Sequence, residues 1–201
     1  EPNNRVHDLH GFVFRGNTSL AQLNNVFQTL KSANIDEFIL DLRYNQGGYI
    51  FAVKQLCSLL APEEVVENEE LLIHKSWNKA YQEKYADDPA RLEEHFDKTV
   101  PLDSRLNLKR LWVITSKVTA SAAEMLISAL SPYMEVNVVG DITMGKNMGG
   151  IIYTPNDKDL QNWNIMLIST EYRNSRGESV KGGIPPCSPS WNNFTINTTR
   201  R

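Results

Sequence analysis

The stretch EFILDLRYNQGG, residues 37–48, joins an apolar run to a loop that ends in two glycines. Residues 37–42 are mostly apolar, which is typical of a strand buried on both faces of a parallel sheet. A helical pattern starts near residue 50 and stops before Pro62. A buried strand, a glycine-containing loop and a helix in this order predict an α/β fold, because parallel strands need a crossover connection that is usually helical.

The same alternation of elements continues on both sides of this stretch. Further strands are expected at 10–14, 70–75, 111–115, 136–140, 150–154 and 163–170, and further helices at 20–30 and 122–130. Strands alternate with helices through residue 140 and then follow one another. We therefore expect a single domain (1–201) with a largely parallel buried sheet flanked by helices and a strand-rich C-terminal part. The more polar segment 63–109 is predicted to be an insertion or covering segment.

The composition is that of a globular domain. Hydrophobic residues make up 41% of the chain, charged residues 22%, and the net charge is −3. No dense basic patch is present, so we expect no nucleic-acid partner, and no apolar run is long enough to span a bilayer. The two cysteines, Cys57 and Cys187, do not amount to a disulfide framework, and the sequence leaves open whether they pair.

Lys146 lies in the glycine-flanked stretch VVGDITMGKNMGG (138–150), which invites a phosphate-binding interpretation. Residues 140–147 match G-x-x-x-x-G-K, but Asn147 stands where a magnesium-binding Ser or Thr is needed, and a strand pattern follows in place of a helix. A second lysine motif, S-x-x-K at 76–79, resembles that of penicillin-binding enzymes. It lies in a charged stretch and no S-D-N motif follows it, so we interpret it as a chance match.

The remaining interpretation pairs Lys146 with a serine elsewhere in the chain. Ser121 lies between a buried strand and the helix 122–130, where the helix dipole and free N–H groups favour negative charge. A serine hydroxyl is a weak nucleophile, and a lysine is a known base for it. Because a lysine in water is protonated at neutral pH, we expect Met144 and Met148 to bury this amine. The alternative is that Ser121 is an ordinary helix cap.

Three blocks resemble, in order, the signature of the carboxy-terminal processing proteases, also called tail-specific proteases. They are DLRYNQGG (41–48), TASAAE (119–124) and GKN (145–147). In that family a buried strand ends in D-L-R-x-N-x-G-G, a serine opens a helix, and a lysine follows about 25 residues later, the same separation as here. The resemblance spans roughly residues 10 to 187.

The resemblance implies a ClpP/crotonase-like core and a serine endopeptidase that cleaves protein chains near their carboxy termini through an acyl-enzyme. Ser121 would be the nucleophile and Lys146 the general base. The oxyanion hole would use the backbone N–H of Ala122 and of Gly47 or Gly48, since consecutive glycines allow close approach of the main chain. No metal or cofactor is implied, the partners would be protein or peptide substrates, and the location would be the bacterial cell envelope.

The chain departs from the family pattern in several places. Many members carry a glutamine where this chain has Gly150, and Asn147 is a candidate substitute that would orient the lysine. An aspartate common in the closing segment is replaced by Pro186, and no PDZ domain is recognised. Three polar residues of the first block are expected to brace its loop without taking part in the chemistry: Asp41, Arg43 and Asn45. These departures keep open a catalytically inactive peptide-binding or scaffolding module, although retention of both Ser121 and Lys146 favours a protease.

Overall fold

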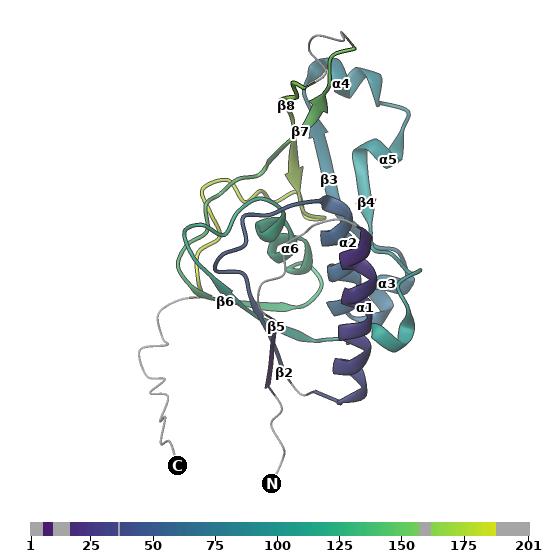
Figure 1. Cartoon of the computed structure of the whole chain (residues 1–201), viewed down its shortest axis with the longest axis vertical. Helices are drawn as coiled ribbons and strands as arrows, with labels where there is room; N and C mark the ends of the chain where they lie inside the picture. The colour runs from purple at the N-terminus through teal and green to yellow at the C-terminus, as the bar shows by residue number, and fades with distance from the viewer. Residues whose placement is uncertain (1–5, 10–16, 36, 157–161, 188–201) are drawn as a thin grey trace.

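The computed structural model describes residues 6–9, 17–35, 37–156 and 162–187. The elements are β1 (Val6–Leu9), α1 (Asn17–Ser32), β2 (Glu37–Asp41), α2 (Ile50–Leu60), α3 (Glu63–Glu67), β3 (Leu71–Trp77), α4 (Lys79–Lys84), α5 (Pro89–Leu92), β4 (Glu93–His95), the 3-10 helix η1 (Leu102–Ser104), β5 (Arg110–Thr115), α6 (Ala122–Leu130), β6 (Glu135–Gly140), β7 (Met148–Tyr153) and β8 (Ile165–Arg173) (Figure 1). The strand predicted at 10–14 lies outside the described residues.

The first sheet has the strand order β1-β2-β5-β6, and all of its neighbouring strands are parallel. The crossovers between these strands carry α1, α2 and α6, and α2 packs against both α1 and α6. Fully buried side chains from the sheet and the helices form the core, among them Phe27, Phe38, Leu40, Leu56, Leu111 and Leu126. The predicted α/β fold with a parallel buried sheet is confirmed.

Helix α2 begins and ends where the sequence pattern predicts. Pro62 disfavours a helical conformation at the residue before it, and Ala61 accordingly has the extended angles φ −62° and ψ 161°. The helix therefore stops at Leu60. Its residues Leu56, Cys57 and Leu60 are fully buried. Burial raises the pKa of the Cys57 thiol, because the thiolate would lose its hydration.

The second sheet is antiparallel, with the order β4-β3-β8-β7. The strand-rich C-terminal part supplies β7 and β8, whereas the 63–109 segment supplies β3 and β4. Leu72, Ile73 and Phe96 from that segment belong to the common core, so it is built into the fold. Strands β3, β7 and β8 extend toward one end of the molecule, away from the parallel sheet (Figure 1). That residues 63–109 cover a substrate stays a prediction.

Two further points concern the cysteines, whose pairing the sequence left open, and membrane-spanning helices. Cys57 and Cys187 are both free thiols. In the described part of the chain, no helix combines the length and apolar character needed to cross a membrane.

Candidate active site

Three loops leave the parallel sheet at the same edge and meet there. Gly47, Ser121 and Lys146 each lie six residues after the last residue of their strand, which is β2, β5 or β6. The strand ends are level, because Asp41 pairs with Ile114 and Thr115 pairs with Gly140. Parallel strands in register deliver their following loops to one edge, which is where sites form in α/β folds. The sheet register therefore brings the three predicted blocks together.

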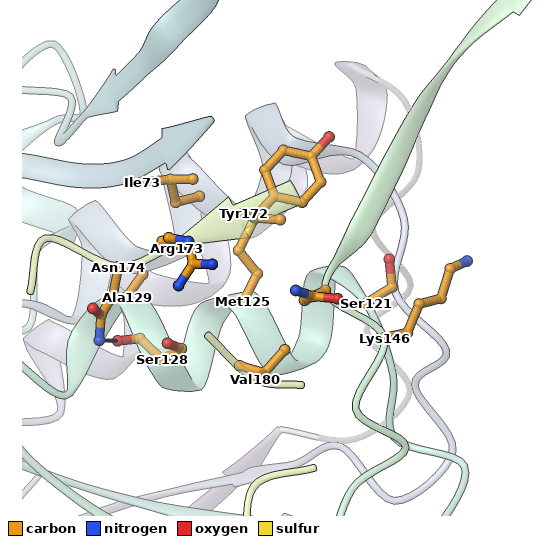
Figure 2. A pocket seen from close by; sticks show the side chains of 11 residues that line it. Ile73, Ser121, Met125, Ser128, Ala129, Lys146, Tyr172, Arg173, Asn174 and Val180 are labelled. Atoms are coloured by element: carbon orange, nitrogen blue, oxygen red, sulfur yellow. Dashed lines mark hydrogen bonds between the residues drawn. The ribbon is translucent and has the colours of Figure 1, made fainter. Parts of the chain in front are cut away.

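Ser121 and Lys146 line the same pocket, and Figure 2 shows both side chains at one end of it. The pocket is narrow, with a volume of about 10 Å³, which is room for about one water molecule. Its apolar wall includes Ile73 and Met125, and Tyr172 also borders it. Burial raises the pKa of the Tyr172 hydroxyl, so this side chain is a neutral wall of the pocket.

Ser121 has a backbone conformation that an ordinary cap does not need. Its angles are φ 58° and ψ −120°, whereas a typical N-cap residue lies in the β region. Few non-glycine residues adopt a positive φ, and those that do concentrate at functional sites where the surroundings hold them. Ser121 is the N-cap residue of α6, but its positive φ is not needed for capping and sets it apart from the other described serines.

Glu124 holds the serine turn and the lysine loop together. It is fully buried in the first turn of α6, and its carboxylate accepts four hydrogen bonds. Oε2 accepts from the backbone N–H of Ser121 at 2.8 Å and of Lys146 at 2.9 Å. Oε1 accepts from the hydroxyl of Thr143 and the backbone N–H of Gly145, both at 2.5 Å. Its place three residues after a helix-starting serine matches a capping box, a signal that the sequence interpretation did not use.

We expect Glu124→Gln to lower the free energy of unfolding by about 3 kcal/mol, because an amide NH₂ would face N–H donors that now have a carboxylate acceptor. Urea unfolding followed by circular dichroism measures this loss. The matched control is Glu135→Gln at an exposed strand position, where we expect a change within about 0.5 kcal/mol. Equal stability of the two variants would contradict the structural role of Glu124.

The glycine loop after β2 lies directly against the serine turn. A Cβ built on Gly47 would be 2.8 Å from both Ser121 Cβ and Ala122 N. The Gly47 N–H donates to Asn45 Oδ1 at 2.9 Å, so it is already used. Within the described part of the chain, neither the Gly48 N–H nor the Ala122 N–H has an acceptor. Of the two glycines proposed for the oxyanion hole, Gly48 is therefore the one whose N–H is available to donate to a substrate oxygen.

The polar residues of this loop are held by hydrogen bonds. The Arg43 guanidinium pairs with the Asp41 carboxylate at 2.6 Å, and the Arg43 carbonyl accepts a short hydrogen bond from the Ser116 hydroxyl. The Thr119 hydroxyl donates to the Leu42 carbonyl at 2.8 Å. These contacts join the loop after β2 to the loop after β5, which positions the glycines beside Ser121.

We expect Gly47→Ala to lower stability. Alanine is strained at the φ of 103°, and its Cβ would collide with the serine turn, so the free energy of unfolding should fall by about 3 kcal/mol. Gly177→Ala is the matched control, since φ is 76° there and open space surrounds the site, so strain alone should cost about 1 kcal/mol. Thermal melts of both variants measure the difference, and equal losses would contradict the close packing of Gly47 against the serine turn.

The prediction that Lys146 is buried is wrong. Its side chain is exposed, as are Met144 and Met148, at 55% and 44%. The reason is that the loop turns its backbone toward Glu124, which leaves the Lys146 side chain on the outside. Asn147 is buried instead, but its amide donates to the Ser179 hydroxyl at 2.8 Å. The lysine loop is thus placed by its backbone and by a neighbouring segment.

The two competing lysine motifs receive no support from the fold. After Lys146 the chain enters strand β7, so no helix N-terminus is available for phosphates as a phosphate-binding loop requires. Ser76 lies in β3 of the antiparallel sheet and Lys79 begins α4, so neither belongs to the three loops that leave the parallel sheet. Of the three interpretations of the lysine motifs, the one that places Ser121 and Lys146 in a common site agrees with the arrangement of the loops.

Residues 8–187 match the family model described as peptidase family S41. A structure described as an S41 protease from Bacteroides fragilis is 25% identical, with a TM-score of 0.79 over 92% of this chain and 47% of that one. The photosystem II D1 C-terminal processing protease is 18% identical, with a TM-score of 0.62 over 92% of this chain and 43% of that one. A lipoprotein from Streptococcus agalactiae is 18% identical, with a TM-score of 0.60 over 92% of this chain and 62% of that one.

The chain spans about half the length of these structures. The family match, by contrast, covers nearly the whole chain, and it includes all three loops of the site. On that match, the chain belongs to peptidase family S41.

Proposed function

We propose that this chain is the core of a serine endopeptidase in which Ser121 is the nucleophile and Lys146 the general base. The observation that carries the proposal is the strained Ser121 backbone, which one buried carboxylate, that of Glu124, ties to the Lys146 loop. A strained backbone at Ser121 lowers the stability of the folded chain, and a helix can start without such strain. A nucleophile needs this conformation if it is to project its hydroxyl toward a substrate.

In the proposed reaction, Ser121 Oγ attacks the scissile carbonyl carbon while its proton passes to Lys146 Nζ. The N–H groups of Ala122 and Gly48 stabilise the resulting oxyanion. The tetrahedral intermediate then expels the amine, which takes the proton from Lys146 and leaves an acyl ester on Ser121. A water molecule gives a proton to Lys146 and attacks this ester; the proton then passes from Lys146 to the departing Ser121 Oγ, which restores the serine and releases the new carboxy terminus.

Exposure of Lys146 places a condition on this mechanism. A general base must stay within hydrogen-bond reach of the hydroxyl whose proton it accepts, and an exposed amine is surrounded by water. We propose that a bound substrate, packing against the exposed Met144 and Met148, excludes water from Lys146 and confines its amine beside Ser121. Residues 63–109 are proposed to cover the substrate as part of a single peptidase core, 1–201.

The proposed substrates are protein chains cut near their carboxy termini, and the proposed location is the bacterial cell envelope. The family resemblance supports both, as do similar structures named a C-terminal processing protease and a lipoprotein. The alternative is a scaffolding module that binds peptides without cutting them. The exposed Lys146, and Gly150 at the position of the common glutamine, favour that alternative.

Cleavage of β-casein separates the two functions. We expect the wild-type chain to hydrolyse casein and to take up one fluorophosphonate group on Ser121, and the Ser121→Ala variant to do neither. Mass spectrometry of the fragments then shows whether the cleavage sites lie near the carboxy terminus of casein. Casein that is bound but left intact by both proteins, with no fluorophosphonate adduct, would establish the scaffolding alternative.

A further inference from the structure

A groove lies over the antiparallel sheet, on the face opposite the Ser121 pocket. Residues that pair across strands share a face, and Ser76, Glu171 and Met148 form such a row across β3, β8 and β7. Successive side chains of a strand point to opposite faces, so this row faces away from Tyr172, which borders the Ser121 pocket. The groove has a volume of about 350 Å³, within the range of about 300–1,000 Å³ that is typical of small-molecule sites.

The polar side chains that border this groove offer mainly hydrogen-bond acceptors. The Glu171 carboxylate can only accept, and the hydroxyls of Ser76 and Ser169 can accept as well. Ser76 lies opposite Glu171, and Ser169 precedes Glu171 by two residues in β8, so the three side chains share one face. Arg173 Nη2 is 3.6 Å from Glu171 Oε2, which is too far for a hydrogen bond. Among the described residues, the carboxylate therefore has room for a closer donor.

Ser169 carries the strongest indication of a ligand. It is 5% exposed, and its hydroxyl is buried with no hydrogen-bond partner among the described residues. It also lies at a β-bulge, because Gly149 and Gly150 of β7 pair with its two neighbours and leave it unopposed. Bulges re-aim side chains and are frequent beside functional sites, and buried hydroxyls nearly always have a partner. A hydrogen-bonding group bound in the groove would supply that partner.

We propose that this groove binds a primary alkylammonium group, from a free amine or from a lysine side chain of a polypeptide. The three N–H donors of an ammonium match the acceptors of Glu171, Ser76 and Ser169. Its aliphatic stem packs against Met148 and Ile168, which are 44% and 55% exposed. Among the described residues that border the groove, Glu171 alone is charged, and its carboxylate repels anions. The inference goes beyond the proposed protease chemistry, in which none of the three acceptors takes part.

Titration of the whole chain with n-pentylammonium, followed by ligand-observed NMR, tests this site. 1-Pentanol keeps the stem without the charge, and pentanoate reverses the charge. We expect n-pentylammonium to bind with a Kd of about 1 mM, as suits a ligand of this size, and 1-pentanol to bind about tenfold more weakly because charged donors make stronger hydrogen bonds. Pentanoate should not bind. Equal affinities for the three compounds, or a preference for pentanoate, would overturn the proposal.

Two variants locate the acceptors. Glu171→Gln should weaken n-pentylammonium at least about fivefold and leave 1-pentanol unchanged, because only the charge is removed. Ser169→Ala should weaken n-pentylammonium about threefold without lowering the melting temperature, because this hydroxyl has no partner in the described chain to lose. The matched control, Glu135→Gln, removes an exposed carboxylate of β6 and should bind as the wild type does. Wild-type affinity in Glu171→Gln, or a lower melting temperature in Ser169→Ala, would contradict the assigned site.

Acetyl-lysine methylamide distinguishes the two sources of the ammonium group. Binding at least as tight as that of n-pentylammonium would support a lysine side chain of a polypeptide. Retained binding of n-pentylammonium with none of the lysine derivative would support a free amine. Binding of neither compound would overturn the proposal. These measurements follow binding alone, so a failure of the protease assignment in the casein and fluorophosphonate assays would leave their outcome unchanged.

Discussion

Replacing Ser121 with alanine is expected to lower kcat for peptide hydrolysis by about 10⁶-fold, the loss typical of removing the nucleophile of a serine protease. Alanine keeps the Cβ and meets the same backbone strain at φ 58°, so the melting temperature should stay nearly unchanged. Initial rates with a fluorogenic peptide, together with the mass of any acyl-enzyme, measure the effect. The loss isolates the hydroxyl, because nothing else in the site changes.

Ser128→Ala is the matched control for this loss. Ser128 lies in the same helix and lines the same pocket, but it has no part in the proposed chemistry. We expect the kcat of Ser128→Ala to remain within a factor of about three of the wild-type value, which corresponds to about 0.5 kcal/mol, as for a typical surface substitution. Turnover that survives in Ser121→Ala, or that disappears equally in Ser128→Ala, would remove Ser121 from the role of nucleophile.

The second large effect is expected at Lys146. Lys146→Ala and Lys146→Arg should both reduce kcat by roughly 10²–10⁴-fold, the usual contribution of general acid–base catalysis. Arginine keeps the positive charge but cannot release its proton at accessible pH, so it cannot accept one from serine. Single-turnover rates of acylation measure the step in which the base acts.

Lys181→Arg makes the same substitution at an exposed residue next to Val180, which lines the pocket. It should leave kcat unchanged. If Lys146→Arg retained wild-type acylation, Lys146 would be an electrostatic group and another base would have to be sought. If Lys146→Ala alone were inactive, positive charge would be the property that matters.

Much of the architecture was predictable because it depends on local patterns. Apolar runs and helical spacing identify β2, α2, β5, α6 and β6, and their alternation predicts parallel strands. The topology then requires the loops carrying Gly47, Ser121 and Lys146 to emerge at one edge. Within 63–109 the apolar run at 70–75 predicted β3, but β4 and the pairing of β3 with β8 were harder, because they depend on contacts across long sequence separations. A polar segment does not reveal such a pairing in its own residues.

The sequence by itself determined the family and the order of the three loops, and it supplied the residues that we propose for the chemistry. Only the tertiary structure decided that Asn45 occupies the Gly47 N–H, that Glu124 joins the serine and lysine loops, and that Lys146 is exposed. Spacing along a chain determines which side chains share a face of a helix or strand. Hydrogen-bond partners and exposure depend on which distant segments pack on that face, and those contacts exist only once the chain has folded.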